Sequence, residues 1–329
     1  MTPPGAATGR ALTERAPQEH APTGRARSLS VIVPTHGRAA LLPAVVEGWL
    51  ALAPSLEPAT AFELVVVDDG SPDATPEVLA GLAQRHPGRL TLVRQANGGL
   101  AAARNAGVDA AGGELLFFAD DDMLPASPDL LARHLHAQAR RPGAWVSHLR
   151  VPDACARTPF QAYWRRRLHA GTERLADGAD LGYGGFWFAC LSLPRRLLGE
   201  RRFSQAFRGY GWEEHELGYR LHRAGVRARF LRGAHLEHHD PVTLAGTYAK
   251  HVAMGRAAWT FRRLHPSARV ALWTGAHPAS LAWRRLTRLE ARAAALLERD
   301  EAELDDRGFA LVLEGGYSRG LREGRLAHA

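Results

Sequence analysis

The stretch ELLFFADDD, residues 114–122, decides the fold class of this chain. Residues 114–119 are mostly apolar and form a run of the length that buried β-strands have, and three aspartates follow without a break. In sheets of parallel strands flanked by helices, ligands bind beyond the carboxyl ends of the strands. The stretch therefore predicts an α/β fold with a functional site directly after this strand.

The residues before this stretch alternate between strand patterns and helix patterns. Apolar runs predict strands over residues 28–34, 62–67 and 90–94, and helical spacing predicts helices over residues 39–52, 76–85 and 100–110. Strands that alternate with helices imply a mainly parallel, Rossmann-like sheet flanked by helices, with right-handed crossovers. After about Asp153 the alternation stops, and we expect residues 160–219 to be irregular.

We expect the chain to have three parts. Residues 1–27 mix Pro, Gly, Thr, Arg and Glu and lack the apolar run of a secretory signal, which predicts a disordered tail. Residues 28–240 form an α/β domain whose halves, residues 28–125 and 126–240, carry different parts of one site. Residues 241–329 have a helical pattern and form an appendage packed on the sheet.

No stretch has the length and composition of a membrane-spanning helix. The best candidate, residues 270–283, is shorter than the roughly 18 residues required and is interrupted by His277 and Pro278. Cys155 and Cys190 give neither a disulfide framework nor a zinc-ligand spacing, which favours a reducing compartment. We therefore expect a cytoplasmic protein, at most attached peripherally to the inner face of a membrane.

The composition is basic, with a net charge of +8 carried almost wholly by arginine, since Lys250 is the single lysine. Such a charge fits a nucleic acid, an anionic membrane surface or anionic small substrates. No groove-reading element is recognisable, and a row of carboxylates in the predicted site would repel nucleic-acid phosphates. We therefore expect no nucleic-acid partner.

Two acidic segments close predicted strands. Asp120 and Asp122 form an Asp-x-Asp pair, a spacing that can hold a hard divalent cation together with phosphate oxygens. A solvated acidic loop is the alternative, and the position at a strand end favours the metal. Asp68 and Asp69 close the strand over residues 62–67, where a carboxylate can accept hydrogen bonds from a base or a ribose hydroxyl.

Four segments in this order carry a resemblance to a known family: SVIVPTHGR (30–38), VVVDDGSPD (65–73), QANGGLAAARNAG (95–107) and LLFFADDD (115–122). Together they resemble the nucleotide-binding half of family 2 glycosyltransferases with the GT-A fold. The segment FSQAFRGYGWEEHELGYRL (203–221) is similar to the acceptor-side segment of that family, which carries a Glu-Asp pair. The resemblance covers roughly residues 28–240.

The resemblance implies an inverting transfer of a sugar from a UDP-, GDP- or dTDP-sugar donor to an acceptor hydroxyl. By the same likeness, Asp120 and Asp122 bind Mn²⁺ or Mg²⁺ and the donor diphosphate, with Asp121 alongside. The implied nucleotide-sugar contacts also include Pro34 and Thr35 beside the base, Asp68 and Asp69 at base or ribose, Arg104 facing the nucleotide, and Arg38 and Asn97.

On the acceptor side the chain departs from the family pattern, because Glu213-Glu214 replaces the Glu-Asp pair. The resemblance implies Glu214 as the general base, with Glu213 as the runner-up, whereas composition alone would make both residues caps of a helix. His238 or His239 would complete the metal site, unless they are exposed loop residues. Trp212 is the best candidate for stacking on an acceptor, although buried aromatics are more often core.

Two other functions stay open. A nucleotidyltransferase on a similar sheet would release pyrophosphate, and a catalytically inactive relative would only bind nucleotide. A dinucleotide-dependent dehydrogenase is disfavoured, because no Gly-x-Gly-x-x-Gly turn follows the first strand. The oligomeric state is left open.

Overall fold

The structure is a computed structural model that describes residues 26–327. The predicted disordered tail therefore lies outside the described residues, apart from its last two positions. The strands of the described part form one sheet in the order β3-β2-β1-β4-β7-β6-β8-β5. Their bounds are β1 (Ser28–Thr35), β2 (Ala61–Asp68), β3 (Leu90–Arg94), β4 (Leu115–Ala119), β5 (Met123–Pro125), β6 (Ala144–Arg150), β7 (Cys190–Pro194) and β8 (Ala228–His238).

The first four long strands confirm the predicted parallel arrangement. β1 pairs in parallel with β2 and with β4, and β2 pairs in parallel with β3. The crossovers contain α1 (Leu42–Leu50), α2 (Thr75–Arg85) and α3 (Leu100–Ala110). α3 lies close to the sheet at Gly107, where a Cβ atom would stand 2.4 Å from the Ile32 side chain. The absence of a side chain at Gly107 therefore allows α3 to approach β1.

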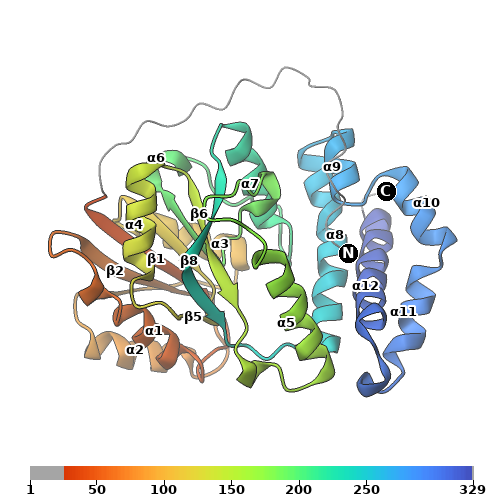
Figure 1. The fold of residues 1–329 in the computed structure, drawn as a ribbon, viewed down its shortest axis with the longest axis horizontal. Helices are drawn as coiled ribbons and strands as arrows, with labels where there is room; N and C mark the ends of the chain where they lie inside the picture. Colours follow the sequence, from red (N-terminus) through yellow and green to blue (C-terminus); the bar gives the residue numbers. More distant parts are fainter. Residues whose placement is uncertain (1–25, 328–329) are drawn as a thin grey trace.

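The second half of the sheet is mixed. β7 runs antiparallel to β4 and β6, β5 runs antiparallel to β8, and β6 and β8 are parallel. α4 (Leu130–Arg140) connects β5 to β6 and lies across one face of the sheet (Figure 1). The prediction of a mainly parallel sheet thus holds for the nucleotide half and not for the edge formed by β5 to β8.

The expectation that residues 160–219 are irregular is wrong. This stretch contains most of α5 (Pro159–Thr172), then β7, α6 (Arg195–Leu198) and the start of α7 (Glu213–Arg223). α5 begins with a capping box, in which the Thr158 side chain accepts a hydrogen bond from the Gln161 backbone and the Gln161 side chain reaches back. The short turns η1 (Ala53–Ser55), η2 (Asp153–Cys155) and η3 (Tyr183–Gly185) complete this part.

The region after β8 is helical, as predicted. It comprises α8 (Leu244–Leu264), α9 (Ala268–Trp273), α10 (Pro278–Leu286), α11 (Leu289–Leu297), the turn η4 (Glu301–Glu303) and α12 (Asp306–Ala327). Figure 1 shows these helices beside the sheet, with α5 between the two. α8 and α12 pack at backbone contact, since a Cβ atom on Gly320 would stand 2.0 Å from the Val252 carbonyl oxygen.

The predicted domain boundaries coincide with breaks between elements. Residue 125 is the last residue of β5, and residue 240 lies between β8 and α8. The boundaries themselves stay predictions. The helical region nevertheless packs on the sheet domain, because Trp212 shares an apolar cluster with Phe261 of α8 and Leu321 of α12. Within residues 26–327, no helix is both long and apolar enough to span a membrane.

Candidate functional site

Three parallel strands end next to one another at the candidate site. Thr35 at the end of β1 pairs in register with Asp68 at the end of β2, and the aspartate triplet follows β4 on the other side of β1. The Thr35 hydroxyl donates a hydrogen bond to Asp121 Oδ2 at 2.7 Å, which links the ends of β1 and β4. Pro34 is buried within β1. These positions agree with the expected ligand-binding edge of the sheet.

The aspartate triplet is a crowded acidic cluster next to one arginine. Arg38 donates a hydrogen bond to Asp240 Oδ2 at 2.9 Å, and its guanidinium lies 3.7 Å from Asp121 and 3.9 Å from Asp122. Burial and the charges of Asp122 and Asp120 raise the pKa of Asp121 to about 6. Carboxylates that repel one another in this way stabilise a bound cation.

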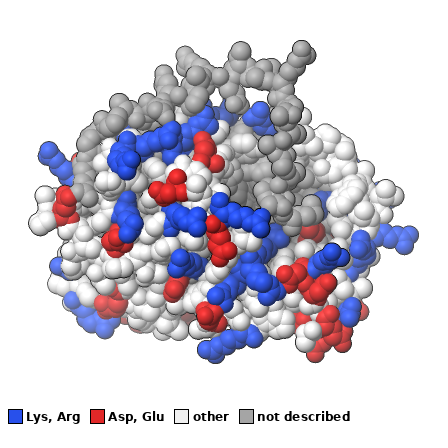
Figure 2. Space-filling model, in the orientation of Figure 1, with Lys and Arg blue, Asp and Glu red and all other residues white. Residues whose placement is uncertain are grey.

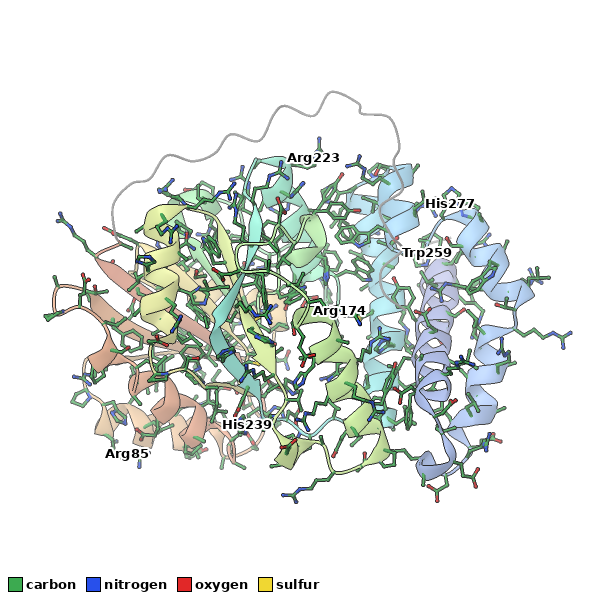
Figure 3. All side chains as sticks on the ribbon, in the orientation of Figure 1. Arg85, Arg174, Arg223, His239, Trp259 and His277 are labelled. Atoms are coloured by element: carbon green, nitrogen blue, oxygen red, sulfur yellow. The ribbon has the colours of Figure 1, made fainter. Side chains whose placement is uncertain are left out.

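His238 and His239 contact different partners. His238 Nε2 lies 3.4 Å from Asp122 Oδ2, whereas His239 Nε2 lies 3.0 Å from Glu237 Oε2. Burial opposes ionisation of Asp122, but the hydrogen bond and the charge of His238 lower the pKa of this carboxyl. Figure 3 labels His239 beyond the end of β8. The structure therefore brings the side chain of His238 to the aspartate triplet, whereas His239 contacts it through its backbone amide, which donates a hydrogen bond to the Asp122 carbonyl.

Asp68 and Asp69 hold the loops that follow their strand. Asp69 accepts hydrogen bonds from Gln95 Nε2 at 2.7 Å and from the backbone of residues 98 and 99 at 2.9 and 2.8 Å. Asp68 Oδ1 accepts a hydrogen bond from the Ser71 backbone at 2.9 Å. Both carboxylates are buried, so a nucleotide would share them with the protein's own loops. Asn97, in the same loop as residues 98 and 99, is exposed.

Arg104 of α3 connects the two halves of the site. Its Nη2 donates a hydrogen bond to Asp120 Oδ1 at 2.8 Å and lies 2.6 Å from Glu214 Oε1, and its Nη1 lies 3.5 Å from Glu213 Oε1. Burial opposes the charge of Arg104, but these three carboxylates raise its pKa. The Arg104 side chain has no exposed surface, so the structure does not support the expected direct contact of Arg104 with the nucleotide. The guanidinium joins carboxylates instead.

A tight turn places the two glutamates at the start of α7. Gly211 has φ +104° and Trp212 has φ +69°, and such a left-handed conformation is uncommon for a residue with a side chain. Gly211 also packs against α8, where a Cβ atom would stand 2.4 Å from Met254 Cγ. The turn orients the first residues of α7 toward the aspartate triplet.

The two glutamates differ in access to solvent. The Glu214 side chain is 19% exposed, whereas the Glu213 side chain is 4% exposed. Burial raises the pKa of Glu214 to about 7, with the charges of Asp120 and Glu213 acting in the same direction against Arg104. Burial also raises the pKa of Glu213. Glu214 is therefore the more accessible of the two carboxyls, and its pKa lies near neutral pH.

The structure does not support the expected stacking of Trp212 on an acceptor. Trp212 is 8% exposed, and its ring packs against His215, Phe261 and Trp273 at centroid distances of 5.3, 5.6 and 5.3 Å. Trp212 belongs to the core that attaches α8 and α9 to the sheet domain. Aromatic rings in such clusters contribute mainly to stability.

Three residues of the site were not singled out as site residues from the sequence. Asp240 pairs with Arg38, and Lys250 of α8 lies with its Nζ 5.5 Å from the ring centroid of Tyr210. Tyr210 is 46% exposed, yet burial of its hydroxyl and the charges of Glu214 and Asp120 raise its pKa. The signals in the sequence were the glycines on both sides of Tyr210 and the presence of a single lysine.

The side chains near the aspartate triplet are of the types that bind a hard divalent cation, but they are not arranged around a common point. Among residues 26–327, no three His, Cys, Asp or Glu side chains already surround one point as metal ligands do. Asp122 Oδ1, however, is buried without a hydrogen-bond partner in the described part of the chain. A carboxylate oxygen in that state is satisfied by a cation, which would also draw in His238 and Asp120.

The comparison with known families identifies the chain. The model of glycosyl transferase family 2 matches residues 30–197, just over half of the chain. This chain belongs to glycosyl transferase family 2. The match contains the four segments that carried the resemblance, and it ends before the acceptor-side glutamates.

Individual relatives agree with the family. The chain is 33% identical over 229 residues to validoxylamine A glucosyltransferase of Streptomyces hygroscopicus subsp. jinggangensis, a match that covers 60% of this chain and 52% of the relative. It is 26% identical to the uncharacterized glycosyltransferase YfnE of Bacillus subtilis, over 54% of this chain and 57% of that protein. The chain thus spans about half the length of the curated relatives it matches.

Solved structures confirm the GT-A fold. The mannosyltransferase PcManGT from Pyrobaculum calidifontis, solved with GDP-Man and Mn²⁺, superimposes with a TM-score of 0.61 over 93% of this chain and 87% of that chain, at 22% identity. GalNAc-T7 with UDP, GalNAc and Mn²⁺ superimposes with a TM-score of 0.50 over 65% of this chain and 43% of that chain, at 18% identity. At these identities the likeness concerns the fold.

Proposed function

We propose that this glycosyltransferase moves a sugar from a nucleotide diphosphate donor to an acceptor hydroxyl, with inversion at the anomeric carbon and Glu214 as the general base. The observation that carries the proposal is the contact of one buried guanidinium with two carboxylates. Arg104 touches Asp120 after β4, where donor phosphates are expected, and Glu214 at the start of α7. The donor side and the acceptor side therefore share one reaction centre.

Glu214 fits the role of base better than Glu213. It is the more exposed of the two side chains, and its raised pKa suits a group that takes a proton near neutral pH. In the proposed step the acceptor oxygen forms a bond to the anomeric carbon, and the bond from that carbon to the diphosphate oxygen breaks. The hydroxyl proton passes to Glu214, and the bonding electrons leave with the diphosphate. Attack from the face opposite the leaving group inverts the centre.

The charge that develops on the leaving diphosphate needs positive groups. Arg38 lies beside the aspartate triplet, and Lys250 is close enough for its charge to lower the pKa of Asp122, against the effect of burial. We propose that both side chains contact diphosphate oxygens. Tyr210, which is exposed and lies next to Lys250, replaces Trp212 as the proposed aromatic contact of a sugar.

We propose Asp120, Asp122 and His238 as the residues that hold Mn²⁺ or Mg²⁺. The unpartnered oxygen of Asp122 supports this set, as do the Mn²⁺ complexes of PcManGT and GalNAc-T7. When bound, the cation would supply positive charge to the phosphate oxygens of donor and product. Asp121, whose Oδ2 accepts a hydrogen bond from Thr35, would position the strand end rather than ligate.

The direct test is a product screen with purified protein. UDP-glucose and GDP-mannose come first, because a relative is named a glucosyltransferase and a structural neighbour was solved with GDP-Man. dTDP-sugars follow, each with Mn²⁺, with Mg²⁺ and with a chelator. We expect metal-dependent release of a nucleoside diphosphate from one donor class. Release of pyrophosphate from a sugar phosphate and a nucleoside triphosphate would favour a nucleotidyltransferase, and binding without turnover would favour an inactive relative.

We also propose that the helical region can attach peripherally to a membrane surface. α10 has no buried residue, and Leu272, Trp283 and Leu286 are 57%, 51% and 82% exposed. Exposed apolar side chains beside arginines such as Arg285 suit an interface with anionic lipid. Co-sedimentation with anionic vesicles, reduced in Leu286→Ser, is the expected result, and equal sedimentation of the two proteins would contradict it.

A further inference from the structure

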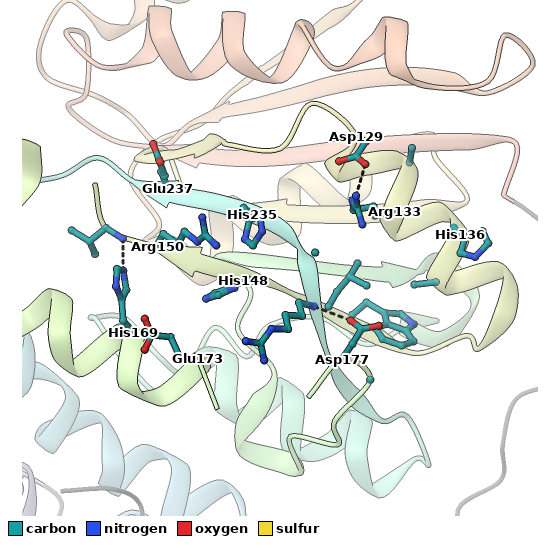
Figure 4. A pocket seen from close by; sticks show the side chains of 18 of the residues that line it. Asp129, Arg133, His136, His148, Arg150, His169, Glu173, Asp177, His235 and Glu237 are labelled. Atoms are coloured by element: carbon teal, nitrogen blue, oxygen red, sulfur yellow. Dashed lines mark hydrogen bonds and ion pairs between the residues drawn. The ribbon is translucent and has the colours of Figure 1, made fainter. Parts of the chain in front are cut away.

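A polar cleft lies on the sheet away from the proposed reaction centre. It has a volume of about 1650 Å³, with β6 and β8 as its floor and α4 and α5 as its walls. None of the aspartates of the triplet, nor Glu213 or Glu214, lines it. Figure 4 shows the labelled side chains of both strands and both helices around this space. In Figure 2, which views the same face as Figure 1, basic side chains gather over this area with acidic side chains among them.

The floor of the cleft is polar by sequence. His148 of β6 pairs in register with His235 of β8, and Arg150 pairs with Glu237. Because residues two apart on a strand share a face, these four side chains lie on the same side of the sheet. A sheet face that packs against a helix is normally apolar. This floor is therefore suited to a polar ligand rather than to a covering helix.

The two histidines of the floor have unmet hydrogen-bonding capacity. Their ring centroids are 5.1 Å apart, and His148 is 6% exposed. The Nδ1 atoms of both rings are buried without a hydrogen-bond partner within residues 26–327. Unpaired buried polar atoms are uncommon in folded proteins because each one lowers stability. Both histidines line this cleft, which is large enough for a ligand.

Arg150 differs from two arginines of the cleft walls, Arg133 and Arg165. Arg133 pairs with Asp129 at 2.7 Å, and Arg165 pairs with Asp153. For Arg150, which is exposed, the described part of the chain provides neither an ion pair nor a side-chain hydrogen bond. Its register partner Glu237 is engaged by His239. Arg232 of β8, which also lines the floor, donates a hydrogen bond to the Leu175 backbone carbonyl. Arg150 is therefore a positive charge of the floor that the described part of the chain leaves without an ion pair.

The charge of Arg150 affects the pKa values of the nearby imidazoles. Burial first, and then the charge of Arg150 among other groups, lowers the pKa values of His148, His169 and His235. Glu173 of α5 acts in the opposite direction on His169. An arginine and three imidazoles that disfavour one another's charge are stabilised when an anion enters.

We propose that this cleft binds a phosphoryl group through Arg150, with hydrogen bonds from His148, His169 and His235. A guanidinium and neighbouring imidazole N–H groups are the donors that phosphate oxygens prefer. The cleft would serve as a second anion site, separate from the donor diphosphate. The phosphoryl group can belong to a soluble molecule or to a lipid headgroup, and the experiment separates these two sources.

The first arm of the test uses inorganic pyrophosphate. Calorimetry is run with a chelator present, so that binding at the aspartate triplet is suppressed. We expect binding by the wild type that weakens about 10-fold or more in Arg150→Ala, as expected for the loss of a charge-assisted hydrogen bond. Arg89→Ala removes the same charge from the loop before β3, at the opposite edge of the sheet, and should bind as the wild type does.

The second arm uses vesicles of phosphatidylcholine with and without phosphatidic acid. Sedimentation with the anionic vesicles that falls in Arg150→Ala and not in Arg89→Ala would identify a lipid headgroup as the source. Pyrophosphate binding with the same selectivity, and no such difference on vesicles, would identify a soluble ligand. Absence of an Arg150-dependent effect in both arms, or equal losses in both variants, would overturn the proposal. Arg150 is exposed, so its substitution is compatible with folding, and a melting curve checks this.

Discussion

The donor half of the site and its acceptor side are held in place by different means. In the donor half, Asp68 ends β2, Asp69 and the aspartate triplet directly follow strands, and their partners include Thr35 at the end of β1 and the Ser71 backbone. On the acceptor side, Glu214 depends on Arg104, 110 positions earlier in the chain, and on a turn that packs against α8. Changes in the donor half should therefore affect ligand affinity, and changes on the acceptor side should affect chemistry and its placement.

The largest effect should come from Glu214→Gln. We expect turnover to fall by about 10² to 10⁴, the range that general-base catalysis contributes, while donor and metal binding persist. Single-turnover rates and calorimetry measure the two properties separately. Glu216→Gln is the control on the same helix, because Glu216 is bonded to Arg220 and His265 and has no proposed role in chemistry. A near-normal rate for Glu214→Gln would move the role to Glu213.

The pH profile sharpens the same contrast. A base must be ionised to act, and the pKa of Glu214 is raised to about 7. We therefore expect kcat/KM to rise about tenfold per pH unit below pH 7 and to level off above it. The effect of pH on stability runs in the opposite direction. Because the pKa of Glu214 is raised from its ordinary value of 4.5, its protonated form stabilises the folded state below pH 4.5, and this contribution is lost as the pH rises through about 7. A flat rate profile between pH 5 and about 8 would contradict the assignment.

Asp122→Asn tests the donor half. Removal of a residue that only hydrogen-bonds to a metal ligand typically lowers metal affinity by roughly 10-fold to 100-fold. Because Asp122 is proposed as a ligand itself, we expect the metal-dependent affinity for UDP or GDP to fall by more than this. Binding measured with a chelator should change little. Asp109→Asn, on the exposed side of α3, is the matched control. Unchanged affinity in the presence of Mn²⁺ would remove Asp122 from the metal site.

Gly211→Ala tests the turn before α7. The added methyl group meets Met254, and the left-handed backbone disfavours alanine, so we expect a loss of about 1–3 kcal/mol in the free energy of unfolding. Turnover should fall more than donor affinity does. Gly209→Ala is the control, because a Cβ atom there meets nothing within 4 Å. Equal melting temperatures for the two variants would show that the turn is not a constraint.

The smallest effect should come from Lys250→Ala. Its side chain is exposed, and an exposed charge contributes about 0.2–1 kcal/mol, so donor affinity should fall by no more than about 5-fold. Lys250→Arg should restore most of the loss. Titration of the donor with each protein measures this. A loss that arginine does not restore would assign the effect to packing against Tyr210 rather than to charge.

The same comparison explains what the sequence could predict. Strand-end residues such as Asp69 and Asp120 carry their signal within a few positions, because an apolar run and the polar residues after it are adjacent in the chain. The buried state of Trp212 depends on Phe261 and Trp273, which lie far along the chain. The joining role of Arg104 depends in the same way on residues 213 and 214. No local pattern carries such contacts.

The helix α5 was missed for a different reason. Its start has the signals of a helix N-terminus, with Thr158 as the cap, Pro159 at the first position and Gln161 at the third. Its apolar residues, however, are interspersed with three consecutive arginines at positions 165–167, which weakens the helical period. The cap was therefore the more reliable signal, and α5 now forms one wall of the cleft above β6 and β8.

The most direct test of inverting transfer with Glu214 as the base is the anomeric configuration of the first product. Hydrolysis of a nucleotide α-sugar donor, with water in place of the unknown acceptor, can be followed by proton NMR before mutarotation mixes the anomers. The account predicts that the β-anomer forms first, in a metal-dependent reaction that Glu214→Gln slows by about 10² to 10⁴. Initial release of the α-anomer would contradict it.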